Sequence, residues 1–222
     1  MRLAEADHAK VSAAVAAAEA TTSGEIVPVV TRASDVYADV ALLWSAAAAL
    51  LAFAVVAAFP DFWAGLYARL RGGWHEHGAR ELLTVLLVLV VVKFAVVRLI
   101  LNWTPLLMAL TPASVKSARV RARALSLFRA GAEQRTIGST GVLLYLSLAE
   151  HRAEIVAEEG IHARVAPEMW GEAMAELISA VRDGRTGDGI AGAIGRIGAV
   201  LAEHFPRAAD DRNELPDRLI EL

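Results

Sequence analysis

VALLWSAAAALLAFAVVAAF at residues 40–59 and LLTVLLVLVVVKFAVVRLIL at residues 82–101 decide how this chain is built. The first stretch carries no charged residue, and the second carries only Lys93 and Arg98. A helix of about 20 apolar residues spans the roughly 30 Å hydrocarbon core of a bilayer. The two stretches therefore predict a transmembrane hairpin in the middle of the chain.

The domain organisation follows from this hairpin. Both flanks of a hairpin lie on the same side of the membrane, so the two ends of the chain are expected to form one discontinuous domain. The predicted segments are residues 1–35 with 113–206 for the discontinuous domain, 40–60 and 82–103 for the transmembrane helices, 61–81 for the loop between them and 207–222 for a flexible tail.

The composition narrows the chemistry. Hydrophobic residues make up 56% of the chain, which is high for a soluble domain and is typical of a protein partly in a membrane. The chain has no cysteine, which excludes disulfides, thiolate zinc sites and cysteine nucleophiles. The N-terminus has no apolar signal segment, so we expect the discontinuous domain to stay on the side where it is made.

A basic segment follows the second apolar stretch. Its members are Lys116, Arg119, Arg121, Arg123 and Arg129. With Arg32 they give six basic residues on this side, against three in the loop, Arg69, Arg71 and Arg80. The positive-inside rule then predicts a two-span protein of the cell membrane with both termini cytoplasmic. We expect the segment to meet anionic lipid and not nucleic acid, because no aromatic residues are interleaved with the charges.

The flanks alternate helix and strand patterns. Helices are expected near residues 5–20, 113–130, 167–183 and 186–205, and strands near 25–30, 142–148 and 152–157. The run Val142 to Leu148 is apolar on both faces apart from Ser147, which is typical of a central strand covered on both sides. The fold class predicted is α/β: an αβα sandwich with a small mixed sheet, interrupted by the transmembrane hairpin.

Several stretches have short sequence motifs in common with a known family. They include Thr22-Ser23-Gly24-Glu25-Ile26, Thr140-Gly141-Val142-Leu143-Leu144-Tyr145 and Glu154-Ile155-Val156-Ala157, followed by Gly160-Ile161, Trp170 and Gly189-Ile190. Over residues 5–35 and 113–206 the chain resembles the TPM domain family, which includes thylakoid lumen proteins of photosystem II repair and bacterial membrane proteins. The resemblance implies an αβα sandwich, and phosphatase activity and divalent-cation binding have been proposed for some members.

Candidate ligand residues are few. Glu158, Glu159 and His162 cluster at the end of a predicted strand, where the carboxylates suit a divalent cation such as calcium, although a solvated turn has the same pattern. His75 and His77 in the inter-span loop are a weaker pair. Residues 187–192 match G-x-G-x-x-G, but they follow a predicted helix and not a strand, which favours a turn over a dinucleotide site.

These observations leave two main functions open. One is a non-catalytic binding or accessory module, anchored in the lipid bilayer, for the assembly or maintenance of membrane protein complexes. The other is a divalent-cation-dependent phosphatase-like hydrolase at the membrane surface. A channel through Lys93 is a third, lesser hypothesis. No catalytic residues and no firm cofactor are predicted, and other membrane proteins are the expected partners.

Overall fold

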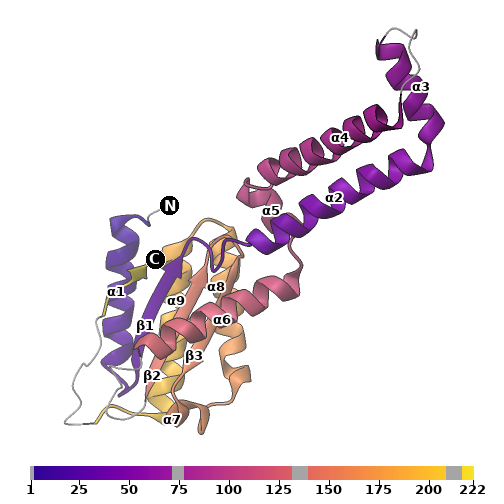
Figure 1. Cartoon of the computed structure of the whole chain (residues 1–222). Helices are drawn as coiled ribbons and strands as arrows, with labels where there is room; N and C mark the ends of the chain where they lie inside the picture. Colours follow the sequence, from indigo (N-terminus) through magenta and orange to yellow (C-terminus); the bar gives the residue numbers. More distant parts are fainter. Residues whose placement is uncertain (1–2, 72–77, 132–139, 209–216) are drawn as a thin grey trace. The chain divides into compact units, whose positions relative to one another are not determined.

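The chain divides into two compact units in a computed structural model that describes residues 3–71, 78–131, 140–208 and 217–222. The first unit combines Met1–Asp35 with Pro112–Leu222, and the second is Val36–Thr111. Figure 1 colours the chain along its length and labels the elements of both units. The first unit is therefore built from segments that lie on either side of the second unit in the sequence.

A small mixed sheet forms the middle of the first unit. Its strands are β1 (Glu25–Thr31), β2 (Gly141–Ser147), β3 (Arg152–Ala157) and β4 (Ile220–Glu221), in the order β3-β2-β1-β4. β1 pairs in parallel with both β2 and β4, whereas β2 and β3 form an antiparallel hairpin. The register sets Ile26 opposite Val142 and Leu144 opposite Ile155.

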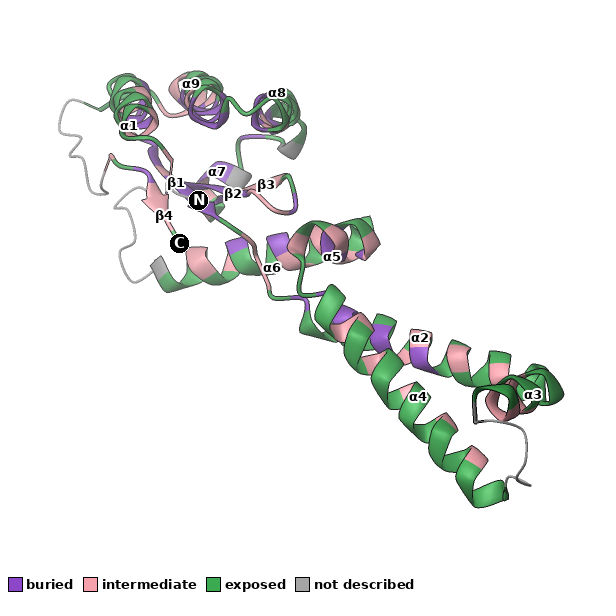
Figure 2. Cartoon of the chain, turned by 90° about the horizontal axis from the view of Figure 1, so that it is seen from above, coloured by how far each residue is buried: buried purple, intermediate pink, exposed green. Residues whose placement is uncertain are grey.

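Helices cover both faces of this sheet (Figure 2). One face carries α1 (Glu5–Glu19), α8 (Gly171–Arg182) and α9 (Thr186–His204), and the other carries α6 (Ala113–Gly131). Side chains alternate along β2, so that Val142, Leu144 and Leu146 join the first core and Leu143 and Tyr145 join the second. The predicted α/β fold with a small mixed sheet is confirmed.

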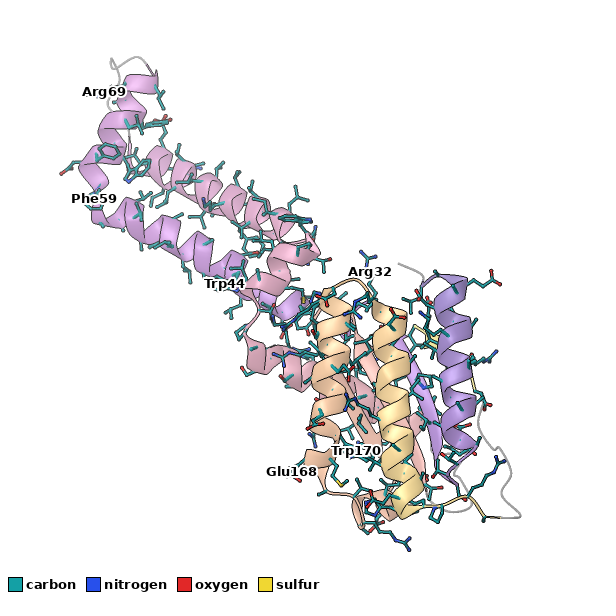
Figure 3. The ribbon with its side chains drawn as sticks, turned by 180° about the vertical axis from the view of Figure 1, so that it is seen from behind. Arg32, Trp44, Phe59, Arg69, Glu168 and Trp170 are labelled. Atoms are coloured by element: carbon teal, nitrogen blue, oxygen red, sulfur yellow. The ribbon has the colours of Figure 1, made fainter. Side chains whose placement is uncertain are left out.

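The larger core lies between the sheet and its layer of three helices. Trp170 ends a short 3₁₀ helix, Pro167–Trp170, and is buried in this core beside α8 (Figure 3). The apolar stripe of α9 is buried as well, through Ile190, Ile194, Ile197 and Leu201. These residues recur at helical spacing, so the apolar stripe of α9 marks the face that the helix buries.

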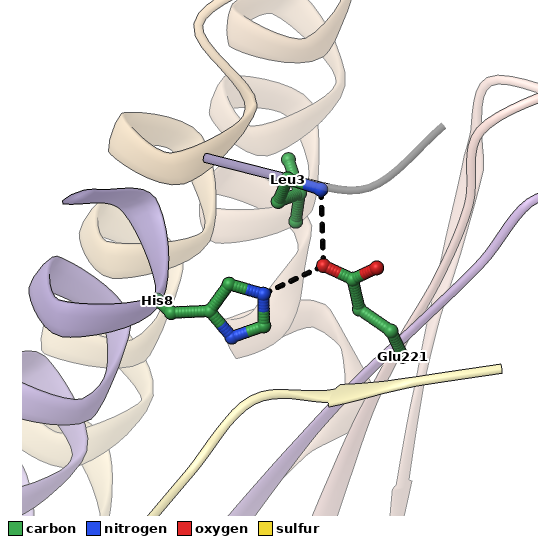
Figure 4. A network of polar contacts seen from close by, with 3 residues as sticks. All are labelled: Leu3, His8 and Glu221. Carbon is green, nitrogen blue, oxygen red and sulfur yellow. Dashed lines mark hydrogen bonds and ion pairs between the residues drawn. The ribbon is translucent and has the colours of Figure 1, made fainter. Parts of the chain in front are cut away.

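The C-terminus corrects one prediction. Residues 207–222 were expected to form a flexible tail; 209–216 lie outside the described residues, but Leu219 is buried and Ile220–Glu221 form β4 beside β1. Figure 4 shows how the end is held: Glu221 Oε1 accepts the Leu3 N–H at 3.0 Å and lies 2.6 Å from His8 Nε2. The expectation of a loose tail is wrong for residues 219–222, because backbone pairing with β1 holds them.

The second unit consists of helices. They are α2 (Ala38–Ala58), α3 (Pro60–Arg71), α4 (Ala79–Ile100) and α5 (Thr104–Leu110). α2 packs along α4, and α3 starts just after Phe59 (Figure 3). The hydroxyl of Tyr67 in α3 donates to Glu81 in α4 at 2.6 Å. By length and composition, α2 and α4 are both able to cross a membrane.

Candidate functional site

A groove of about 480 Å³ runs beside the edge of the sheet in the first unit. Its lining comes from four segments: Lys116 of α6, Glu150 and His151 of the β2–β3 turn, Arg152, Ala153 and Glu154 of β3, and Met174, Ile178 and Arg182 of α8. Because α6 and α8 cover opposite faces of the sheet, the groove follows the rim of β3 with one helix on each side.

The turn at one end of the groove is held by a buried carboxylate. Glu150 is only 5% exposed, and its two oxygens accept hydrogen bonds from the Ser34 N–H, at 2.8 Å, and from the Ser147 hydroxyl. His151 beside it has a φ of 48°, in the left-handed region that a tight turn requires. Glu150 is therefore already engaged by the fold and has little capacity left for a ligand.

Two basic side chains of the groove, Arg152 and Arg182, are less engaged. Arg152 has a buried Nε with no hydrogen-bond partner in the part of the chain that the structure describes. Arg182 is exposed and makes no ion pair with the described residues. Burial raises the pKa of Glu154, while Arg121 and Arg152 act against this rise. The basic side chains of the lining, Lys116, Arg152 and Arg182, outnumber the acidic ones, Glu150 and Glu154.

The rim of β3 also offers unpaired backbone groups. The Glu158 N–H donates to the Gly141 carbonyl at 2.9 Å, which fixes the alternation of the antiparallel β2–β3 ladder. By that alternation, the N–H and C=O groups of Ala153 and Ile155 point away from β2. Within the described residues, β3 pairs with no other strand. The groove is thus a sheet edge with helices on either side.

The chemistry of this lining suits binding better than catalysis. It contains no serine, threonine or cysteine that would serve as a nucleophile, and its histidine is exposed on the turn. Ser34 and Tyr145 lie nearby with their hydroxyl oxygens 2.9 Å apart, and burial raises the pKa of Tyr145. A neutral phenol hydrogen-bonded to a serine holds structure and does not activate the serine.

Comparison with known proteins adds a family to this geometry. Residues 107–200 match the model of the TPM domain. The chain contains a TPM domain. The matched range includes β2, β3, α8 and most of α9. The structure adds α1 and β1, which precede the match, to the same sheet and core.

A solved structure supports the fold. The NMR structure of BA42 protein from the psychrophilic bacterium Bizionia argentinensis is similar to this chain with a TM-score of 0.57 and 17% sequence identity. The similarity covers 100% of this chain and 97% of the BA42 chain. At this identity the likeness concerns the fold alone. No curated protein matches the chain.

The residues predicted to bind a cation take separate places in the TPM domain. Glu158 Oε2 accepts the Gly141 N–H at 2.8 Å, and Glu159 begins α7 (Glu159–His162) as an exposed residue. The side chain of His162 lies outside the described residues, as do His75 and His77. Within the described residues, no three histidine or acidic side chains are placed to hold a metal ion. The calcium hypothesis stays a prediction.

The basic segment lies along α6. Arg119 forms an ion pair with Asp35, and Lys116 lines the groove. Arg121, Arg123 and Arg129 are exposed. Contact of this segment with lipid stays a prediction. The position of Lys116 in the lining of the groove was not expected from the sequence.

The sequence alone therefore did not predict the groove, although it predicted the helices and the strand that line it. The strand predicted near residues 152–157 is β3, in which Arg152 and Glu154 alternate with Ala153. Nothing local indicated that this strand lies at the edge, because pairing depends on segments far away in the chain. The same holds for Met174 and Ile178 of α8, which are partly buried against the core and also line the groove.

Proposed function

We propose that this protein is anchored in the cell membrane by α2 and α4 and uses its TPM domain as a binding module. In this proposal the two helices cross the bilayer as a hairpin, and the TPM domain acts on the cytoplasmic side. Its role is non-catalytic: it binds membrane proteins and supports the assembly or maintenance of their complexes.

The exposed apolar surface of α2 and α4 carries the proposal. α4 has no buried residue over its 22 residues. Its exposed large side chains include Leu83, Leu87, Val88, Val91 and Leu99, and those of α2 include Leu42, Leu43, Leu50 and Leu51. Soluble monomers rarely expose continuous apolar patches larger than a few hundred Å². A core helix of a soluble protein would be buried, so lipid is the solvent that suits this surface.

The contact between the two helices supports insertion as well. The residues that α2 buries include Ala41, Ser45 and Ala49, which are small and recur every fourth residue. Small residues at this spacing let two helices approach closely in lipid, where packing drives association. The large apolar side chains of both helices are left to face outward.

The charge in α4 fits an anchor better than a pathway. Lys93 lies seven residues before the end of α4 at Ile100, and it is exposed. A lysine on the lipid-facing side extends its ammonium group along the helix towards the nearest interface. Channel function would require this charge to face a protein-lined path.

The orientation rests on the distribution of basic residues. Arg32 and the five basic residues of α6 flank the hairpin on one side, whereas the segment between the helices has three arginines. The positive-inside rule assigns the more basic side to the cytoplasm. The first unit, which contains Met1–Asp35 and Pro112–Leu222 and most of the TPM domain, is then cytoplasmic.

Cysteine labelling tests insertion and orientation together, because the natural chain contains no cysteine. Single cysteines are placed at exposed positions: Ala16→Cys in α1, Ser126→Cys in α6 and Gly65→Cys in α3. Intact expressing cells, stripped of any outer barrier, are treated with a membrane-impermeant maleimide before and after lysis. We expect Gly65→Cys to react in intact cells, and the other two to react only after lysis.

Each alternative gives a distinct pattern. Protection of Gly65→Cys with labelling of Ala16→Cys and Ser126→Cys in intact cells would reverse the orientation. Protection of all three cysteines before lysis, together with release of the protein by alkaline carbonate, would contradict membrane anchoring.

A further inference from the structure

We propose that the groove beside β3 binds an extended, acidic segment of a partner protein, which adds to the sheet as a strand next to β3. This inference rests on the proposed binding role and identifies its site and ligand class. In this mode of recognition, backbone hydrogen bonds give affinity and alternate side-chain pockets give specificity.

The backbone of β3 is ready for such an addition. The N–H and C=O groups of Ala153 and Ile155 point outward, and within the described residues no group pairs with them. Free edges of this kind are often blunted by bulges, by proline or by charged side chains. β3 has no proline among its six residues, Arg152–Ala157, and no bulge in its register with β2, and its charged side chains are Arg152 and Glu154. Two neighbouring outward-facing residues offer up to four hydrogen bonds to an added strand.

The two walls of the groove differ in chemistry, and this predicts the ligand's pattern. On the α8 side, Met174 and Ile178 give an apolar wall next to Ala153 and Ile155. On the α6 side, Lys116 and Arg152 supply positive charge. Side chains of an added strand alternate between these walls. The matching segment therefore alternates apolar and acidic residues.

The charge of the groove lining favours an acidic partner over a basic or neutral one. The lining has three basic residues, Lys116, Arg152 and Arg182, and two acidic ones. Glu150 is buried and accepts two hydrogen bonds from the fold. Arg152 Nε is buried without a partner among the described residues, and an incoming carboxylate would supply one.

The test uses the full chain in neutral detergent micelles and a fluorescent, end-capped octapeptide of alternating valine and glutamate. Binding is followed by fluorescence anisotropy. We expect saturable binding that weakens at least tenfold in the double variant Arg152→Glu/Arg182→Glu. The matched control is Arg129→Glu, which makes the same kind of charge reversal on α6 outside the groove and should bind like the natural chain. A lysine–valine octapeptide should not bind.

Two N-methylated peptides test the backbone bonds on the natural chain, so they do not depend on whether a variant folds. One carries methyl groups on every valine nitrogen and the other on every glutamate nitrogen. In a strand only one of these sets faces β3, so we expect one methylated peptide to lose binding and the other to retain it.

Several results would overturn the inference. They are no binding of the valine–glutamate peptide, equal binding of the lysine peptide, equal behaviour of the two methylated peptides, or equal loss in Arg129→Glu. The chain could also dimerise through the edge of β3, and the peptide would then dissociate the dimer. This result would mean that the ligand of β3 is a second copy of the chain and not a partner protein. Because the binding test needs no bilayer, its failure leaves the cysteine-labelling result on membrane anchoring intact.

Discussion

The two units use similar apolar residues in opposite ways, as α9 and α4 illustrate. α9 buries Ile190, Ile194, Ile197 and Leu201 almost completely, whereas α4 is longer and buries nothing. In α9 these residues form one stripe, with polar and small residues on the other face. In α4 they surround the helix. A stripe directs a helix to a protein core, and an apolar circumference suits lipid.

Two tryptophans give the strongest test of this contrast. Trp170 is 7% exposed in the core of the first unit, whereas Trp103 is 65% exposed in the second. Trp170→Ala should lower the free energy of unfolding of the first unit by about 3–5 kcal/mol, since truncation leaves a large cavity. Trp103→Ala should cost less than about 0.5 kcal/mol, as surface changes do. Hydrogen exchange of the β2 amides measures both, and equal protection in the two variants would contradict the contrast.

Two glycines of α9 test the same contrast between a buried and an exposed position within one helix. A Cβ added at Gly198 would lie 2.5 Å from Ala18 Cβ in α1, whereas at Gly195 it would meet nothing within 4 Å. Gly198→Ala should therefore destabilise the first unit by about 1–3 kcal/mol through overpacking. Gly195→Ala should stabilise it by up to about 1 kcal/mol through helix propensity. Thermal unfolding of the two variants should shift in opposite directions, and a shared direction would show that α1 and α9 are not in close contact.

The corresponding pair in the second unit is Ala49 and Ala47 of α2. Ala49 is buried, whereas Ala47 is exposed two residues earlier. Ala49→Leu should weaken packing between α2 and α4 by about 1–2 kcal/mol, because the larger side chain does not fit. Ala47→Leu should be nearly neutral. Unfolding in detergent, followed by a fluorophore pair across the hairpin, measures the difference, and equal effects would mean that α2 packs on another face.

Much of the fold was predictable because periodicity reports burial. The stripe Val11, Val15 and Ala18 is buried, and the doubly apolar β2 is covered on both faces. The glycines of α9 were harder to interpret. Gly192, Gly195 and Gly198 recur at every third residue, but of these only Gly198 lies close to a neighbouring helix, and Gly189 lies close to Ala180. The spacing of glycines shows where they lie on a helix. It does not show whether a neighbouring helix packs closely against them.

The features that the sequence did not predict have a different cause, which is pairing between segments that are distant in the chain. β4 has two residues, too few for any alternation, and becomes a strand only because β1 offers it an edge. Pro28 lacks an N–H donor, which favours an edge position or a bulge, but β1 has β2 on one side and β4 on the other. Its pairing with β4 starts one residue later, at Val29. The candidate groove was missed for the same reason, since it arises where α6, α8 and β3 meet.

Gly141, at the start of β2, is restricted by a neighbouring side chain and not by its own backbone conformation. Among the described glycines only Gly184 has a positive φ. Gly141 instead donates its N–H to Glu158, and an added Cβ would lie 3.3 Å from that carboxylate. The restriction comes from a side chain seventeen residues later, which the local sequence does not show.

The smallest expected effect concerns a carboxyl group where α1 meets β1. Burial raises the pKa of Glu19 from 4.5 to about 8, and the charges of Glu25 and Asp217 add to the rise, while the Ile26 N–H, which donates to Glu19 at 2.8 Å, acts against it. The folded chain thus holds a proton that the unfolded chain releases above about pH 4.5. This contribution to stability is complete below pH 4.5 and is lost as pH rises through about 8.

Glu19→Gln removes the titration and retains the size of the side chain. The free energy of unfolding of the natural chain should fall relative to this variant between pH 5 and 9, by about 1 kcal/mol or less because Glu19 is partly solvated. Glu203→Gln in α9, at an exposed carboxyl, is the matched control and should leave the pH profile unchanged. Parallel profiles for the natural chain and Glu19→Gln would mean that Glu19 is charged in the folded state. Its carboxylate would then be solvated, and the first unit would be open where α1 meets β1.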